Sequence, residues 1–332
     1  MTTTGQGQRI YYLLKAVNNL RKGVSLYPSA CLVMSIIEVI DSQSGGNDEQ
    51  ESNPTGQKAI QCVDDCLGFV DLVIASITEY DSQVKEALKV ITRKKKAPIE
   101  HVEEHIFTGA STHRDTQSKL LDLLEFVVLS SNHTVTIQTK NIDVLWRIYV
   151  NSPNFTSDQV QFLQFINKRR QRPMRQMVDA TGFNERGYQE VYLLSPEEQK
   201  HLFTSILCNS STVDYRKLSA GIAKCFHTYF RLINRDEGHL DLSKRKVEVL
   251  DFERLVGMPS LWEISFDCEN ERARDDSREL LVDLHLRLSP AYDPKMKKEI
   301  MLTFLDRSMS SLAETGSDLS QEGSARKASS LV

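Results

Sequence analysis

The stretch that decides the fold runs from Cys225 to Pro290 and reads CFHTYFRLINRDEGHLDLSKRKVEVLDFERLVGMPSLWEISFDCENERARDDSRELLVDLHLRLSP. Residues 214–233 place apolar side chains at helical spacing, and Gly238 follows as a stop signal. A second helix is predicted just after Pro259, and a third from about Glu271 to Leu288. The stretch therefore predicts three helices joined by connectors.

The end of the third predicted helix is ambiguous. Val282, Leu284, Leu286 and Leu288 alternate with charged residues, which is a strand pattern. Leu281, Leu284 and Leu288 also fit one face of a helix, and the charged lead-in ERARDDSRE contains few residues that favour strands. We therefore expect a helix here, with a strand as the alternative.

Helical periodicity extends over most of the remaining chain. Asp115 is predicted to cap a strongly apolar helix, and Ser195-Pro196-Glu197-Glu198 has the pattern of a capping box with proline at the first helical position. Asp293-Pro294 is predicted to start a last helix, with a stripe formed by Met301, Leu305, Met309 and Leu312. The other predicted helices lie at about 9–20, 28–40, 57–77, 81–93, 142–150 and 156–168.

Two short sequences suggest an internal repeat. Leu145-Trp146-x-Ile148 and Leu261-Trp262-x-Ile264 each follow one apolar helix and precede another. Such an echo is typical of irregular helical repeats of the armadillo or HEAT kind, in which each unit packs on its neighbours. The predicted fold is therefore all-α, an irregular armadillo/HEAT-like α-solenoid, with both tryptophans as core anchors.

Polar segments divide the chain. Residues 41–56 (DSQSGGNDEQESNPTG) contain almost no apolar side chains and are predicted to be a disordered loop. The expected organisation is N-terminal helices at 1–96 that include this loop, a connector at 97–114, an armadillo-like helical region at 115–314 and a disordered serine-rich tail at 315–332.

Composition narrows the functional classes. A net charge of −4 gives no general case for binding nucleic acid or membranes. The longest apolar run, residues 30–40, is too short to span a bilayer. Six scattered cysteines in 332 residues do not form the disulfide framework of a small secreted domain. These features favour a cytoplasmic location.

One string has the spacing of a zinc site. His101-Val102-Glu103-Glu104-His105 is an H-x-x-E-H sequence, in which two histidines on one helix face bind zinc and the glutamate acts as a base. A working site needs a third ligand, and the string reads more simply as a solvated connector. Cys62 and Cys66 could complete a Cys₂His₂ site, but both lie in an apolar run and are expected in the core. No metal or other cofactor is predicted.

No catalytic or cofactor-binding residues are predicted. A cysteine protease needs a thiolate with a histidine base, yet Cys31 and Cys208 stand in apolar segments without such a partner. Cys225 and His227 are two residues apart, which places them on different helix faces. The chain also lacks a P-loop, a G-x-S-x-G elbow and a dinucleotide-binding glycine pattern.

The strongest charge feature is a basic run beside an aromatic helix. Its candidate partner-binding residues are Lys168, Arg169, Arg170, Arg172 and Arg175. The run has the composition of a nuclear import signal or of a surface for an acidic partner. The simpler interpretation is a solvated helix end followed by a loop, because cations are favoured in the last helical turn.

Taken together, several of these sequences resemble a known family. They are the CF-x-x-x-F start at Cys225, the SKRK run at 243–246, Leu261-Trp262, the end at Leu288-Ser289-Pro290, and the earlier segments THRDTQSKLLDLLEFVV and NIDVLWRIYV. Over residues 112–290 the chain resembles the non-catalytic helical arm of the fat facets-type giant ubiquitin-specific proteases. The cysteine and histidine boxes of that family's catalytic domain are not visible in this sequence.

The resemblance implies a helical scaffold that holds substrates or regulators for deubiquitination. Its partners would be proteins of the ubiquitin pathway, and its location cytoplasmic, with the nucleus as a second compartment. Two alternatives remain at this point. One is an unrelated helical adaptor protein, and the other is a zinc metalloenzyme that uses His101 and His105.

Overall fold

The computed structural model describes residues 68–95, 107–108, 111–130, 135–173, 188–242 and 247–317. It divides into two compact units, the first ending at Glu198 and the second beginning at Gln199. In the described residues the fold is all-α and armadillo-like, apart from three two-stranded antiparallel ladders.

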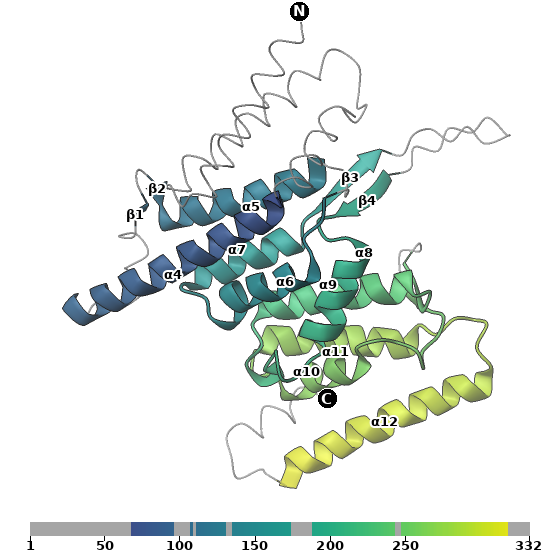
Figure 1. Cartoon of the computed structure of the whole chain (residues 1–332). Coiled ribbons are helices and arrows are strands. Elements are labelled where there is room, and N and C mark those ends of the chain that lie inside the picture. Colours follow the sequence, from purple (N-terminus) through teal and green to yellow (C-terminus); the bar gives the residue numbers. More distant parts are fainter. Residues whose placement is uncertain are drawn as a thin grey trace, which may run out of the picture. The chain divides into compact units, whose positions relative to one another are not determined.

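The first unit is built mainly from helices (Figure 1). Their bounds are Phe69–Lys95 for α4, His113–Ser130 for α5, Thr139–Trp146 for α6 and Thr156–Ile166 for α7. A π-helical turn, η3 (Arg147–Asn151), continues α6 without a break. The ladders pair β1 (Phe107–Thr108) with β2 (Ser111–Thr112), and β3 (Arg169–Pro173) with β4 (Tyr188–Tyr192).

The second unit also consists mainly of helices, with a short antiparallel ladder. α8 (Pro196–His201) spans the division and continues into the π-helical turn η4 (Leu202–Leu207). The later elements are η5 (Tyr215–Lys217), α9 (Ala220–Asp236), β5 (Leu240–Asp241), β6 (Glu248–Val249), α10 (Met258–Asp267), α11 (Glu271–Leu286) and α12 (Pro294–Ser317).

The apolar core of the first unit centres on three aromatic side chains. Trp146, Tyr149 and Phe162 are each at most 1% exposed. The rings of Tyr149 and Phe162 stack at a centroid distance of 5.0 Å, and Trp146 meets Phe162 edge-on at 6.4 Å. Because Trp146 ends α6 and Phe162 lies in α7, this contact joins the two helices.

A buried polar chain crosses the same unit. The Nε2 atom of His113 lies 2.9 Å from Asp158 Oδ1, and its Nδ1 atom lies 2.9 Å from the hydroxyl of Tyr80. All three side chains are buried, and each comes from a different helix: α4, α5 or α7. Every polar group pairs if the imidazole donates to the carboxylate and accepts from the hydroxyl. Burial, and next the charge of Asp158, raises the pKa of nearby Tyr149 well above its usual value.

In the second unit, α9 presents the apolar face that its sequence predicts. Ile222, Phe226, Tyr229, Phe230 and Ile233 are all buried. The predicted start near residue 214 is wrong, because residues 215–217 form η5 and α9 begins only at Ala220; Leu218, which is also buried, lies between the two. The predicted stop is confirmed, because Gly238 has φ 77° and its N–H bonds to the carbonyl of Arg235. The N–H of His239 bonds to the carbonyl of Asn234, which completes a Schellman motif.

Gly257 is required where the chain enters α10. Its φ of 88° lies in the left-handed region, and a Cβ atom there would stand 2.5 Å from Cζ of Phe203. The following helix carries Trp262, which stacks on Phe266 at 5.3 Å and is 6% exposed. The guanidinium of Arg307, from α12, lies 4.3 Å from the centre of the indole. These contacts confirm that Trp262, like Trp146, is a core anchor.

The ambiguous segment near Leu288 is resolved as a helix with a short extended end. α11 continues to Leu286, and Leu288 then forms an isolated parallel bridge with Val249. The helical expectation is therefore confirmed over most of the segment. The alternating pattern marks the exit from the helix.

Two predicted helices are in fact one. The expected break between 57–77 and 81–93 is wrong, because α4 runs unbroken from Phe69 to Lys95. Asp81, the predicted start of the second helix, lies inside α4, where its carboxylate pairs with Lys85 at 2.9 Å and accepts a hydrogen bond from Asn154 at 2.8 Å.

The cap of α5 is shifted by one turn from its predicted position. Thr112 caps the helix, since its hydroxyl accepts from the N–H of Asp115 while the Asp115 carboxylate accepts from the N–H of Thr112. At α8 the glutamate half of the predicted capping box is confirmed, because the Glu198 carboxylate accepts from the N–H of Ser195 at 2.9 Å. The Ser195 hydroxyl donates to the same carboxylate.

The predicted stripe of α12 is not its buried face. The helix exists as expected, but it buries Ile300 and directs Phe304 towards the rings of Trp262 and His285. Leu305 and Met309 are 48% and 67% exposed, respectively. The helix carries apolar residues on two faces, and periodicity alone does not say which face packs.

Removing the indole of Trp146 should destabilise the first unit. We expect Trp146→Ala to lower the free energy of unfolding by about 3–5 kcal/mol, the usual cost of emptying a large aromatic site. Val160→Ala on α7 is the control, because Val160 is exposed and its truncation should cost less than about 0.5 kcal/mol. Urea unfolding followed by circular dichroism measures both, and equal midpoints would contradict the assignment.

Candidate groove and basic edge

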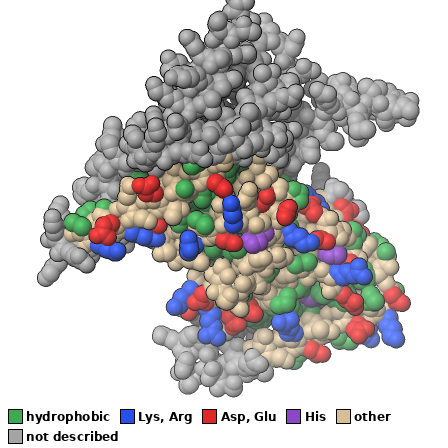
Figure 2. Space-filling model, viewed as in Figure 1, with side chains coloured by type: hydrophobic (Ala, Val, Ile, Leu, Met, Phe, Trp, Pro, Cys, Tyr) green, Lys and Arg blue, Asp and Glu red, His purple; other side chains and the backbone are tan. Residues whose placement is uncertain are grey.

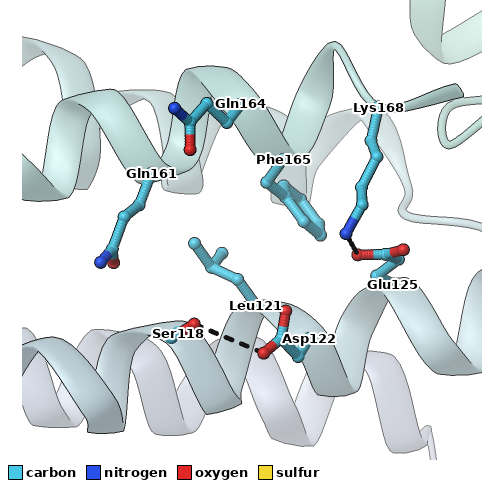
Figure 3. A pocket seen from close by; sticks show the side chains of 8 residues that line it. All are labelled: Ser118, Leu121, Asp122, Glu125, Gln161, Gln164, Phe165 and Lys168. Atoms are coloured by element: carbon cyan, nitrogen blue, oxygen red, sulfur yellow. Dashed lines mark hydrogen bonds and ion pairs between the residues drawn. The ribbon is translucent and has the colours of Figure 1, made fainter.

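A groove lies between α5 and α7 in the first unit, with a volume of about 220 Å³. Figure 3 shows that α5 and α7 form its two sides. It is lined by Ser118, Leu121, Asp122, Glu125, Gln161, Gln164, Phe165 and Lys168. The residues from α5 and those from α7 are spaced at about one helical turn, so each set belongs to one helix face.

Two polar contacts join the helices on either side of the groove. The hydrogen bond between His113 and Asp158 lies on the N-terminal side of the groove residues in both helices. The ion pair between Glu125 and Lys168 lies at the C-terminal end of the groove. The numbering increases in the same direction along both helices between these contacts, so α5 and α7 run parallel. The two contacts therefore set how far apart the walls stand.

The groove has an apolar floor and a polar rim. Leu121 and Phe165 are buried beneath it. On the α5 side Asp122 is exposed and accepts a long hydrogen bond from Ser118, at 3.4 Å. On the α7 side the side-chain oxygen of Gln161 is buried and has no hydrogen-bond partner in the described part of the chain. An unpaired acceptor of this kind is favourable only when a donor reaches it.

The ion pair at the end of the groove is unequal in burial. Lys168 Nζ lies 2.5 Å from Glu125 Oε2, and the Lys168 side chain is 51% exposed whereas that of Glu125 is 8% exposed. The lysine thus offsets the charge of a mostly buried carboxylate. Asp122 lies in the same groove, so the rim holds two carboxylates and one cation.

The predicted basic run begins at this lysine but is not a helix end followed by a loop. After Lys168 the backbone enters β3, whose register pairs Arg169 with Tyr192, Arg170 with Val191 and Arg172 with Gln189. Arg175 lies outside the described residues. The run therefore forms one strand of a two-stranded ladder, which we call the basic edge (residues 168–173).

The described thiols lack the environment of a nucleophile. Burial raises the pKa of Cys208 to about 12, and burial also raises the pKa of Cys268. Cys225 is fully buried, whereas His227 points to Ser277, with Nε2 2.7 Å from its hydroxyl oxygen. The predicted separation of Cys225 and His227 onto different faces is consistent with these contacts.

The structure does not test the candidate zinc site. His101, His105, Cys62 and Cys66 all fall outside the described residues, as does Cys31. Within the residues that the structure does describe, no group of three or more histidine, cysteine or acidic side chains is placed to hold a metal ion.

Sequence reasoning overlooked both the groove and the buried chain of Tyr80, His113 and Asp158. A signal for the groove exists in the sequence. Ser118, Asp122 and Glu125 follow the i, i+4, i+7 spacing of one helix face, and Gln161, Gln164 and Phe165 follow i, i+3, i+4 on α7. Lys168 lies just beyond the end of α7. Each set flanks a buried stripe, but their proximity depends on how α5 and α7 pack.

Comparison with known families gives the class of the chain. Residues 1–234 match the UBP24/USP9X/USP9Y ARM repeat family. The chain therefore belongs to this family of armadillo repeats. The match confirms the resemblance to the helical arm of the giant ubiquitin-specific proteases. It also includes residues 1–111, which lie outside the stretch of the resemblance and whose helices were predicted from periodicity alone.

No curated protein matches the chain. Among the described helices, none combines the length and the apolar character that crossing a membrane requires.

The three described cysteines should be unreactive in the folded protein. In a variant with Cys31, Cys62 and Cys66 changed to serine, we expect iodoacetamide to label Cys208, Cys225 and Cys268 at pH 7 at least about ten times more slowly than in urea, because the thiolate is the reactive form. Mass spectrometry of labelled peptides measures the rates. Fast labelling of one thiol, with cleavage of a fluorogenic ubiquitin substrate, would show an activated nucleophile.

Acid should weaken the second unit through His227. Burial lowers the pKa of this imidazole from 6.5 to about 4, so between these values the unfolded chain binds a proton that the folded chain does not. Its contribution to stability is present above pH 6.5 and is lost as the pH falls towards 4, by about 2 kcal/mol between pH 7 and pH 5. Urea midpoints across this range measure the loss, and His227→Gln should flatten it. An unchanged slope in that variant would exclude His227 as its source.

Proposed function

We propose that this chain is a non-catalytic helical scaffold of the ubiquitin system that binds protein partners. The observation that carries the proposal is the match of residues 1–234 to the ARM repeat family. Repeats of this kind stack helices into extended surfaces, and such surfaces serve recognition. We further propose that the chain acts in the cytoplasm or the nucleus, on substrates or regulators of deubiquitination.

The charge distribution supports local binding sites. On the face shown in Figure 2, Lys and Arg side chains alternate with Asp and Glu over the described residues. A surface of mixed charge gives no general attraction for polyanions. Specific recognition would then depend on small clusters, and the basic edge is the basic cluster that directly follows the aromatic helix α7.

The basic edge is proposed to meet an acidic partner. Four of the five candidate residues, Lys168, Arg169, Arg170 and Arg172, belong to this edge, and the fifth, Arg175, follows it in the sequence. Because alternate positions of a strand belong to opposite faces, Arg170 and Arg172 share one face of the ladder, and Arg169 lies on the other. A partner that binds one face would therefore depend on Arg170 and Arg172 together, or on Arg169.

Charge reversal at the basic edge tests the proposal. We expect Arg170→Glu with Arg172→Glu to reduce the recovery of ubiquitin-pathway proteins from cell extract by at least about fivefold, since opposing charges are replaced by like charges. Recovery by the unchanged chain should fall as salt rises, because exposed charges are screened beyond about 8 Å at physiological ionic strength. Quantitative mass spectrometry of the bound fraction measures both effects.

A matched control separates this effect from net charge. Lys295→Glu with Lys298→Glu on α12 changes the charge by the same amount, and both lysines are exposed. This control should retain the partners. If both double variants recover the same proteins as the unchanged chain, the basic edge is not the binding surface.

A further inference from the structure

We propose that the groove between α5 and α7 receives a single arginine side chain from an extended segment of a protein partner. The inference rests on the proposed scaffold function and adds to it the chemistry of one anchor. Three properties of the groove support it: its size, its excess of negative charge, and an unpaired acceptor in its wall.

The size of the groove suits one long side chain. Its volume of about 220 Å³ is below the roughly 300–1,000 Å³ of pockets that bind small molecules. Protein interfaces commonly anchor on a few side chains that fill small pockets, and arginine is enriched among them. The buried floor of Leu121 and Phe165 offers an apolar surface along which the methylene stem of an arginine would lie.

The charge of the groove favours a cation. Asp122 and Glu125 contribute two carboxylates, and Lys168, the cation in the lining, pairs with Glu125. Figure 3 shows Asp122 on the α5 side, where its hydrogen bond joins it to Ser118. That bond is long at 3.4 Å, so the carboxylate retains capacity to accept stronger, charge-assisted bonds from a ligand.

The glutamine side of the groove favours arginine over lysine. The buried oxygen of Gln161 lacks a donor within the described chain. A guanidinium presents five N–H donors in a planar fork, so one edge can bond to Asp122 while another N–H reaches Gln161. The compact ammonium of lysine is a point charge on a flexible stem and satisfies separated acceptors less well.

The test uses the full chain and a defined probe. The probe is a nine-residue peptide of glycine and serine with one central arginine, and its counterpart carries citrulline, the neutral isostere. Backbone amide signals report binding by nuclear magnetic resonance. We expect the arginine peptide to shift the signals of residues 118–125 and 161–168 at concentrations at least about tenfold lower than the citrulline peptide, because only the former makes a charge-assisted bond.

Variants identify the groups responsible. Asp122→Asn should remove the preference for arginine over citrulline. Gln161→Leu should lower the affinity of the arginine peptide by at least about fivefold. Asp143→Asn is the control, because Asp143 is an exposed carboxylate of α6 outside the groove. It should bind both peptides as the unchanged chain does.

The outcomes separate this inference from the proposed function. Equal binding of the two peptides, or shifts confined to residues outside the groove, would overturn the arginine anchor. If Asp122→Asn also leaves the recovery of partners unchanged while reversal at Arg170 and Arg172 abolishes it, the scaffold function stands without this anchor. If the two peptides bind equally and reversal at Arg170 and Arg172 also leaves partner recovery unchanged, both the arginine anchor and the basic edge are excluded as binding sites.

Discussion

The first unit depends on one buried interaction, the hydrogen-bonded chain from Tyr80 through His113 to Asp158. A carboxylate and an imidazole removed from water are costly unless each finds its partner. Here the partners come from α4, α5 and α7, so the polar groups are satisfied only when the three helices have the right separation and register. Apolar packing is not directional, so it specifies the register of two helices less strictly than these hydrogen bonds, which break when one helix shifts along another.

In the second unit, aromatic side chains hold the helices in their relative positions. Trp262, His285 and Phe304 meet with ring centroids 4.3–6.0 Å apart, and Arg307 covers the indole. These contacts attach α12 to α10 and α11 through one face. Leu305 and Met309 stay exposed on another face of α12. Attachment through a few large side chains explains why a helix rich in apolar residues buries so few of them.

Local chemistry made much of the fold predictable. The apolar face of α9, the stop at Gly238 and the capping box at Ser195 depend on neighbours within a few residues, and each was predicted from the sequence. The errors arose where distant residues intervene. Asp81 was predicted to start a new helix, but it lies inside α4, and its carboxylate accepts a hydrogen bond from Asn154, 73 residues away. The groove was missed for the same reason, since Glu125 and Lys168 are 43 residues apart. The basic run was identified, but not as a strand, because arginine-rich sequence carries little strand signal.

Lys168 connects the two proposed binding features. Its side chain closes the groove by pairing with Glu125, and its backbone accepts a hydrogen bond from Leu193 as the chain passes into β3. A partner segment with an arginine in the groove would thus lie next to the first residues of the basic edge. The two sites have opposite charge preferences. A segment that satisfied both would need a cation followed by acidic residues, and a uniformly charged segment would be attracted at one site and repelled at the other. If both proposed sites bind as described, this opposition would let the surface select among partners in a way that a single charged patch would not.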